Sequence, residues 1–279
     1  MQDAGLGALD YLVIGHVTQD RTADGGWTVG GTAAYAARTA RALGCRTAVL
    51  TSAADGLELN QALPDIAVWR VPAPSTTTFE NQYTSGGRVQ FIRAVAAPLT
   101  PDAVPAAWHT ARLVHLGPVA GECDPALAGL FPAAFLGLTP QGWMRRWDGT
   151  GRVWSGPWEG AAPLLRRAAA VVLSEEDVGG ERALIRRWAA QTRVLAVTQA
   201  AAGCTVHAGG AVWHLPAPPV VEVDPTGAGD IFAAVFFVRL WRGDDPPTAA
   251  QRANVVAAAS VTRRGLLGTP AAQEFDGSP

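Results

Sequence analysis

Short apolar runs alternate with longer amphipathic or alanine-rich segments along most of the chain. The runs at 11–17, 46–53 and 65–71 are rich in branched residues and predict buried strands. Between the first two lies an alanine-rich segment, 30–44, which ends in glycine and predicts a helix; a further short helix is expected at 55–63. This alternation predicts a mostly parallel sheet with helices on both faces.

The rhythm breaks between residues 76 and 97. The stretches 76–84 and 88–97 alternate polar and apolar positions and flank a Ser-Gly-Gly turn, which predicts an exposed β-hairpin. We interpret it as part of a small β-lid, formed from segments near 18–30 and 72–97, on a single domain that spans 1–279. The strand-helix pattern then resumes, with strands predicted at 112–119, 135–141, 169–178 and 193–199, a hairpin at 204–216, and helices at 181–191, 227–243 and 247–265.

Composition favours one large α/β domain that acts on a small molecule. The chain has 279 residues, of which 48% are hydrophobic, so it can bury a sizeable core. A net charge of −2 with 16% charged residues gives no global basic field for nucleic acid or anionic membranes. The apolar stretch 231–241 is too short to span a bilayer, and residues 1–10 lack a signal-peptide pattern. We therefore expect a cytoplasmic protein.

Cysteine and lysine usage narrows the chemistry. Cys45, Cys123 and Cys204 are far apart and match no disulfide framework or zinc spacing, so we expect buried thiols. All 22 basic residues are arginine. The absence of lysine excludes a Schiff-base lysine and a Walker-A lysine, so any phosphate chemistry depends on backbone N–H groups, arginine and metal.

The stretch VDPTGAGD, residues 223–230, places the carboxylate of Asp230 in the first turn of an apolar helix. A helix N-terminus has unpaired N–H groups and partial positive charge, so it can hold an anion. Gly227 and Gly229 would let a phosphate approach those groups, and Thr226 could bind it or cap the turn. A carboxylate there can accept a proton from an attacking hydroxyl. Taken alone, the residues also fit a capped turn with a favourable N-terminal charge.

Four segments in order resemble the motifs of the PfkB (ribokinase-like) family of carbohydrate and nucleoside kinases. Residues 224–236 resemble its C-terminal signature and residues 29–44 its double-glycine motif. Residues 197–207 resemble its nucleotide-site turn and residues 252–265 its final helix. The resemblance implies a Rossmann-like three-layer α/β/α fold with a β-lid. It also implies phosphorylation of a hydroxyl by ATP with Mg²⁺.

The resemblance assigns roles to individual residues. It implies that Asp230 is the catalytic base and that the backbone of Gly227, Ala228 and Gly229 forms an anion hole for the transferred phosphoryl group. Asp20 matches the aspartate that binds substrate hydroxyls. The other substrate-site positions are Gly30 and Gly31, where backbone approaches the substrate, and Tyr35, where the family often has a sugar-binding asparagine.

The nucleotide and metal positions follow in the same way. The resemblance implies nucleotide contacts at Thr198, Gly203, Thr226, Gly227, Gly229 and, beside the adenine, Asn254. Ala200 stands where the nucleotide turn usually has glycine. The family's metal-linked Asn-x-x-Glu motif is Ser-Glu-Glu-Asp here, so Asp177 and Glu176 are the metal candidates, acting through water.

Within the family, residues 76–105 and 138–153 resemble the plant-type myo-inositol kinase branch. Gln141 and Arg145 in the second of these follow a predicted strand, at the carboxyl edge where open α/β sheets bind ligands. Arg145 could meet the γ-phosphate or a substrate oxygen. An inositol-like cyclitol is therefore favoured over ribose, fructose or a nucleoside.

Two functions other than a kinase were considered, and the sequence excludes one of them. A ligand-binding relative without turnover stays open because the metal motif is altered. A dehydrogenase is excluded, since no GxGxxG follows the first strand. An exposed edge of the lid could pair with a second copy, so a homodimer is also predicted.

Overall fold

The computed structural model describes residues 9–22, 25–84 and 87–275. Its centre is a nine-stranded sheet in the order β15-β14-β13-β12-β9-β8-β1-β4-β5. Seven strands are parallel and adjacent in register, whereas β14 and β15 add an antiparallel hairpin at one edge. The strands of this sheet are β1 (Tyr11–Ile14), β4 (Thr47–Ala53), β5 (Ala67–Pro72), β8 (Leu113–Leu116), β9 (Phe135–Leu138), β12 (Ala170–Ser174), β13 (Val194–Thr198), β14 (Cys204–Ala208) and β15 (Ala211–Leu215).

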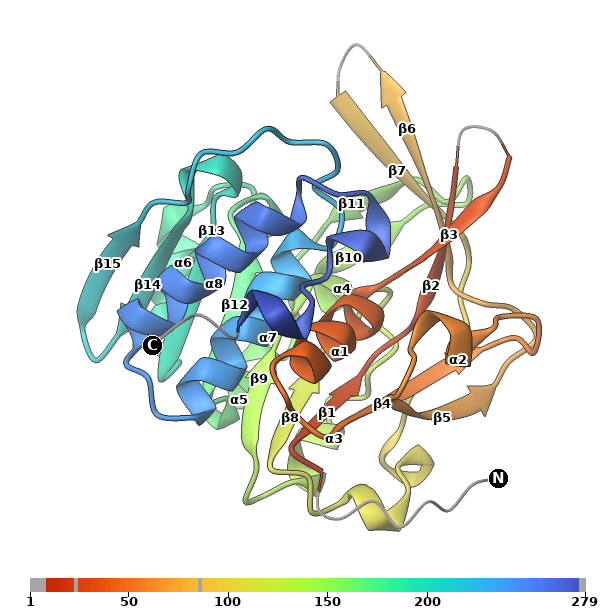
Figure 1. The fold of residues 1–279 in the computed structure, drawn as a ribbon, viewed down its shortest axis with the longest axis horizontal. Coiled ribbons are helices and arrows are strands. Elements are labelled where there is room, and N and C mark those ends of the chain that lie inside the picture. The colour runs from red at the N-terminus through yellow and green to blue at the C-terminus, as the bar shows by residue number, and fades with distance from the viewer. Residues whose placement is uncertain (1–8, 23–24, 85–86, 276–279) are drawn as a thin grey trace.

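Helices cover both faces of this sheet, as the alternation predicted. The helices are α1 (Thr32–Ala42), α2 (Leu59–Ala62), α3 (Leu127–Leu130), α4 (Gln141–Met144), α5 (Ala161–Arg167), α6 (Arg182–Ala189), α7 (Ala228–Trp241) and α8 (Pro246–Ser260). Helices α1, α7 and α8 lie in front of the sheet in Figure 1 and share one buried cluster with it. Residues of α3, α5 and α6 form a second cluster.

Alternating side chains of the same strands divide between the two cores. In β1, Val13 faces the α1 and α7 side, whereas Leu12 and Ile14 face the other. Every residue of β1, β4 and β8 is buried, as expected for parallel strands covered on both faces. The structure therefore confirms the predicted Rossmann-like three-layer fold.

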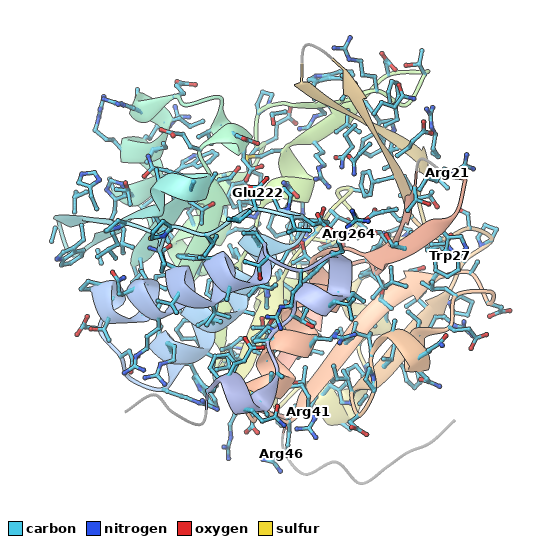
Figure 2. The ribbon with its side chains drawn as sticks, turned by 45° about the horizontal axis from the view of Figure 1, so that its top comes forward. Arg21, Trp27, Arg41, Arg46, Glu222 and Arg264 are labelled. Carbon is cyan, nitrogen blue, oxygen red and sulfur yellow. The ribbon has the colours of Figure 1, made fainter. Side chains whose placement is uncertain are left out.

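A second, four-stranded sheet stands away from the large one, and we call it the small sheet. Its strands are β3 (Trp27–Gly30), β2 (Thr18–Arg21), β6 (Thr78–Thr84) and β7 (Gly87–Ala94), in that spatial order. Figure 1 shows β6 and β7 projecting above the main body, and Figure 2 shows Arg21 and Trp27 at its outer side. The predicted hairpin is present between β6 and β7, although residues 85–86 of its turn and residues 23–24 of the predicted lid lie outside the described residues.

The sequence pattern missed one feature that reaches the small sheet. Arg145–Trp147 and Val153–Ser155 form an antiparallel hairpin, β10 and β11. The N–H of Ile92, in β7, donates to the carbonyl of Gly151 in this hairpin at 2.8 Å. Three-residue strands with polar sequence give too short a period to recognise. The hairpin nevertheless links the small sheet to the segment that carries Arg145.

The three cysteines are buried and unpaired, as expected. Burial raises the pKa of each thiol, which keeps all three in the protonated, unreactive form. Within the described part of the chain, no helix is both long and apolar enough to cross a bilayer.

Candidate active site

The N-terminus of α7 presents backbone N–H groups to the carboxyl edge of the large sheet. Gly227 precedes the helix in the left-handed conformation, with φ of 80°. The N–H of Ala228 donates to the carbonyl of Pro225 at 3.2 Å. Among the residues that the structure describes, the N–H groups of Gly227 and Gly229 donate no hydrogen bond. Two of the three predicted anion-hole amides are thus available to bind an anion, whereas the N–H of Ala228 already donates within the turn.

Asp230 lies in the first turn of α7 and is partly buried among groups from distant parts of the chain. The hydroxyl of Thr32, the first residue of α1, donates to Asp230 Oδ1 at 2.7 Å. Burial, with smaller contributions from the charges of Asp177 and Asp20, raises the pKa of Asp230 from 3.8 to about 6. The Thr32 hydrogen bond and the guanidinium of Arg145 act in the opposite direction. Asp230 as a residue retains partial exposure, so a carboxyl group with a raised pKa lies at this site.

Asp20 approaches the same place from the small sheet. It lies on β2, beside Gly30 of β3, and accepts a hydrogen bond from the Thr18 hydroxyl at 3.3 Å. A side chain at Gly30 would overlap the Asp20 carboxylate. Gly31, with φ of 88°, precedes α1 and packs against the carbonyl of His16. Both predicted glycines therefore allow close packing around Asp20 and the start of α1.

Tyr35 is buried, with only 2% of its surface exposed. Its ring lies against Gly227, where a Cβ atom would overlap the ring carbons. Burial raises the pKa of Tyr35, and the neighbouring carboxylates Asp20, Asp224 and Asp230 raise it further. The residue thus packs between α1 and the turn before α7. This placement leaves little of its surface for the substrate contact that its position predicts.

Gln141 and Arg145 point to different partners. The side-chain amide of Gln141 donates to Asp177 Oδ1 at 3.3 Å. Arg145 donates from Nη1 to the carbonyl of Val119 at 2.8 Å, and its guanidinium carbon lies 4.9 Å from the centre of the Phe79 ring. Since Phe79 belongs to β6, Arg145 lies between the large sheet and the small sheet.

A pocket of about 380 Å³ opens beside Arg145 and does not include Asp230. It is formed by glycines, tryptophans and arginines of the segments after β8 and β9. Its lining residues are Ala120, Gly121, Gly142, Trp143, Arg145, Arg146 and Trp147.

The altered metal motif forms a closed turn. Asp177 Oδ2 accepts from the N–H of Ser174 at 2.8 Å, and the N–H of Asp177 donates to the Ser174 hydroxyl at 3.1 Å. Glu176 is exposed in the same turn. Within the described ranges, no three acidic, histidine or cysteine side chains gather as a ready-made metal site. A Mg²⁺ ion bound through one or two carboxylates, water and phosphate oxygens would still fit Asp177, which retains partial exposure.

The predicted nucleotide residues divide into two groups. Thr198 ends β13 and Thr226 lies in the turn before α7, so both are at the carboxyl edge. Gly203, with φ of 96°, packs closely against the carbonyl of Leu215. The side-chain amide of Asn254 is buried and donates to the same carbonyl at 3.0 Å. Gly203 and Asn254 therefore fix the end of β15, and an adenine contact by Asn254 stays a prediction.

Asp224 organises the turn that precedes α7, and the sequence reasoning missed it. Its carboxylate accepts from the N–H of Thr226 at 3.0 Å and from the N–H of Gly265 at 2.8 Å. Although burial opposes ionisation, these hydrogen bonds and the charge of Arg264, labelled in Figure 2, lower the pKa of Asp224. Its place at the start of Asp-Pro-Thr-Gly is the signal that could have identified it.

Thr32, His16 and Glu122 were also missed. Thr32 directly follows the double glycine, a position that favours capping and side-chain hydrogen bonds. His16 and Glu122 follow β1 and β8 and are buried, with 0% and 4% exposed. Their spacing in the sequence, 106 residues, gives no sign that they meet.

Comparison with known proteins identifies the family. The model of the pfkB family carbohydrate kinases matches residues 168–272. Inositol 3-kinase of Zea mays is 30% identical over 289 residues, a match that covers 92% of this chain and 73% of the relative. The chain belongs to the pfkB carbohydrate kinase family. It is a phosphotransferase with a hydroxyl acceptor.

Solved structures of this family share the fold. A pyrophosphate-dependent myo-inositol-1 kinase, converted by mutation into a myo-inositol-3 kinase, superposes with a TM-score of 0.80. That match has 22% sequence identity and covers 95% of this chain and 99% of the other. Ribokinase of Arabidopsis thaliana, complexed with ribose and ATP, superposes with a TM-score of 0.73 at 17% identity and covers 96% and 97% of the two chains. At these identities the likeness establishes the ribokinase-like fold.

Proposed function

We propose that this pfkB-family kinase transfers the γ-phosphoryl group of ATP to a hydroxyl of a small polyol, with an inositol-like cyclitol as the preferred acceptor. One observation carries the proposal. Asp230, with a pKa raised to about 6, lies beside the available N–H groups of Gly227 and Gly229. The charges of Asp20 and Arg145 are near enough to affect that pKa. A proton acceptor, an anion site and an acceptor-binding carboxylate therefore converge at one sheet edge.

The acceptor hydroxyl gives its proton to Asp230 as its oxygen attacks the γ-phosphorus of ATP. The bond from that phosphorus to the β–γ bridging oxygen breaks, and ADP leaves with its electron pair. The carboxylate is ionised at neutral pH and is oriented by the Thr32 hydroxyl. Thr32 holds Oδ1, so Oδ2 is the oxygen that takes the proton. In such transfers positioning and electrostatic stabilisation supply most of the barrier reduction. The N–H groups of Gly227 and Gly229 stabilise the charge that develops on the phosphoryl oxygens.

Asp20 orients the acceptor by accepting hydrogen bonds from neighbouring hydroxyls. A carboxylate can bind two vicinal hydroxyls, and it disfavours analogues that lack them. Arg145 contributes positive charge that acts on Asp230. Because the small sheet carries Asp20 and Phe79, we assign it the role of a lid that limits water access during transfer.

The donor assignment rests on the nucleotide-turn resemblance at 197–207. Mg²⁺, held through Asp177 and water, would neutralise the donor phosphates. Among the structures that share the fold, one contains ATP and another is pyrophosphate-dependent, so pyrophosphate is the donor to test against ATP.

The acceptor assignment rests on the match with inositol 3-kinase, which covers 92% of this chain. Ribose, fructose and nucleosides are the alternative acceptors. They would engage Asp20 through their own vicinal hydroxyls.

The test is a matrix of acceptors and donors with the purified protein. Inositol isomers, pentoses, hexoses and nucleosides are each combined with ATP or pyrophosphate and Mg²⁺, and phosphorylated product is measured by mass spectrometry. We expect the highest kcat/KM with an inositol and ATP. If product forms with pyrophosphate and not with ATP, the donor is pyrophosphate. If kcat/KM is higher with ribose or fructose than with an inositol, that sugar is the acceptor. Binding by calorimetry without product under any condition would instead establish a ligand-binding relative.

A further inference from the structure

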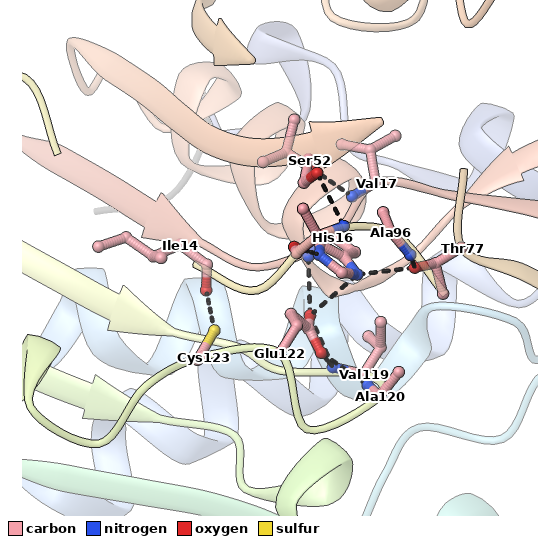
Figure 3. Close-up of polar contacts among 12 residues, drawn as sticks. Ile14, His16, Val17, Ser52, Thr77, Ala96, Val119, Ala120, Glu122 and Cys123 are labelled. Atoms are coloured by element: carbon pink, nitrogen blue, oxygen red, sulfur yellow. Dashed lines mark hydrogen bonds and ion pairs between the residues drawn. The ribbon is translucent and has the colours of Figure 1, made fainter. Parts of the chain in front are cut away.

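A closed ring of contacts joins the small sheet to the large sheet. We propose that His16 and Glu122, at the root of the small sheet, are positioning residues that set the place of Asp20 and Arg145 in the acceptor site. The inference rests on the proposed function, because it concerns acceptor binding. Figure 3 shows the polar part of this network.

Glu122 is a buried carboxylate that accepts backbone hydrogen bonds from two connections. It accepts from the N–H of His16 at 2.8 Å, after β1. It also accepts from the N–H groups of Val119 at 3.0 Å and Ala120 at 2.7 Å, after β8. Hydrogen bonds to a charged acceptor are stronger than neutral ones. One carboxylate therefore fixes where the chain leaves β1 and where it leaves β8.

His16 extends this connection to both strands of the β6–β7 hairpin. Its Nε2 lies 2.9 Å from the carbonyl of Ala97, which can only accept, so Nε2 carries the hydrogen. In that tautomer Nδ1 accepts from the hydroxyl of Thr77 at 2.7 Å. The same hydroxyl accepts from the N–H of Ala96 at 2.9 Å. The imidazole thus holds the entry to β6 and the exit from β7 together.

Thr77 transmits this restraint to Asp20. The carbonyl of Thr77 accepts from the N–H of Gln19 at 2.9 Å, and Asp20 is then paired with Phe79 across β2 and β6. A change in the position of Thr77 would move the strand that carries Asp20, since parallel strands share their register.

Phe79 and Arg145 close the ring. The Phe79 side chain packs under the guanidinium of Arg145, which also donates to the carbonyl of Val119. Val119 is itself held by Glu122. Phe79 and Val119 belong to one small buried cluster, which Ile92 and Ala120 complete. The positions of the two candidate acceptor-binding side chains, Asp20 and Arg145, consequently depend on the same buried carboxylate, Glu122, and imidazole, His16.

Thr77→Val tests the ring without touching a residue of the reacting site. The substitution keeps the shape of the side chain but leaves His16 Nδ1 and the Ala96 N–H without their partner. We expect the acceptor KM to rise about tenfold, which corresponds to about 1.4 kcal/mol of binding, with the donor KM unchanged. Thr77→Ser, which keeps the hydroxyl, should restore the acceptor KM.

Thr47→Val is the matched control. Thr47 is a buried threonine at the amino end of β4, and its hydroxyl donates to the carbonyl of Cys45 at 3.1 Å. Its loss should lower stability and leave the acceptor KM unchanged. If Thr47→Val raises the acceptor KM as much as Thr77→Val, or if Thr77→Val leaves it at the wild-type value, the proposal is wrong.

Hydrogen exchange of the ligand-free variants supplies a second measurement that needs no turnover. In Thr77→Val the amides of β2 and β6 should exchange faster, while those of β1 and β8 keep their protection. Equal exchange in wild type and variant would overturn the inference even if no acceptor is phosphorylated, whereas absence of product in wild type would contradict only the proposed function. Glu122→Gln exchanges one acceptor oxygen for an amide donor, so it should also raise the acceptor KM and speed the exchange of the β2 and β6 amides. This variant takes the place of Thr77→Val if Thr77→Val does not fold.

Discussion

Replacing Asp230 by asparagine should sharply lower kcat and stabilise the fold. Asparagine retains an oxygen that can accept the Thr32 hydrogen bond, but it cannot take a proton from the acceptor. Loss of a general base costs about 10²- to 10⁴-fold in kcat. The same change removes a charge that burial makes unfavourable.

The stabilisation follows from the pKa. Burial raises the pKa of Asp230 from 3.8 to about 6, and one pKa unit is worth about 1.4 kcal/mol, so the ionised carboxylate costs the folded state up to about 3 kcal/mol. Because Asp230 is partly exposed, solvent screens part of this cost, and we expect a destabilisation of about 1–2 kcal/mol. Because the folded-state pKa is raised, the cost is fully present above pH 6 and disappears as the pH falls towards 3.8.

Urea unfolding of wild type and Asp230→Asn at pH 8 and pH 5 measures this directly. We expect the variant to be more stable at pH 8, with about half of that difference at pH 5. In wild type, kcat/KM should fall with acid below about pH 6, as Asp230 becomes protonated. A variant that is less stable than wild type at pH 8, or a difference that does not shrink at pH 5, would refute the reasoning.

Asp224→Asn is the control for this experiment, because its carboxylate has the opposite environment. Its pKa is lowered by hydrogen bonds from the Thr226 side chain and the N–H of Gly265. Its ionised form therefore stabilises the fold above the unfolded-state pKa, and that contribution is lost as the pH falls through the folded-state value. The asparagine variant should be less stable at pH 8 by about 0.5–1 kcal/mol, because the carboxylate is partly exposed and solvent screens its interactions. The two substitutions, one in the turn before α7 and one in the first turn of α7, should thus change stability in opposite directions.

The remaining predictions concern backbone positions in the two predicted phosphate turns. Gly229→Ala should fold normally, because a Cβ there meets no atom within 4 Å, but kcat/KM should fall about 10²-fold as the methyl group displaces the phosphoryl group. Gly227→Ala should instead lower the free energy of unfolding by about 1–3 kcal/mol, since its Cβ overlaps the Tyr35 ring and φ is 80°; equal stability of the two variants in urea would contradict this. Ala200→Gly should raise the free energy of unfolding by about 0.5–1 kcal/mol, because Ala200 has φ of 49° and the left-handed strain exceeds the added chain entropy. An unchanged or lower urea midpoint for Ala200→Gly would show that the position is unstrained.

The sequence by itself determined the order of the elements and the place of the proposed base, Asp230. Hydrophobic period is a local property, so the parallel strands, the helices α1, α7 and α8, and the hairpin of β6 and β7 were predictable. The glycines and Asp230 at the start of an apolar helix predicted an anion site with a carboxylate beside it. The short β10 and β11 strands were not predictable, because three residues carry no period.

Only the tertiary structure decided which side chains meet. Thr32 and Asp230 are 198 residues apart, and His16 and Glu122 are 106 apart. Their contacts depend on the spatial order of the strands, in which β1 lies between β8 and β4, and no local pattern encodes that order. The same packing buries Tyr35 against Gly227, and its contact with substrate stays a prediction. Sequence periodicity thus specifies the elements, whereas the close packing of distant segments sets the charges and hydrogen bonds of the site.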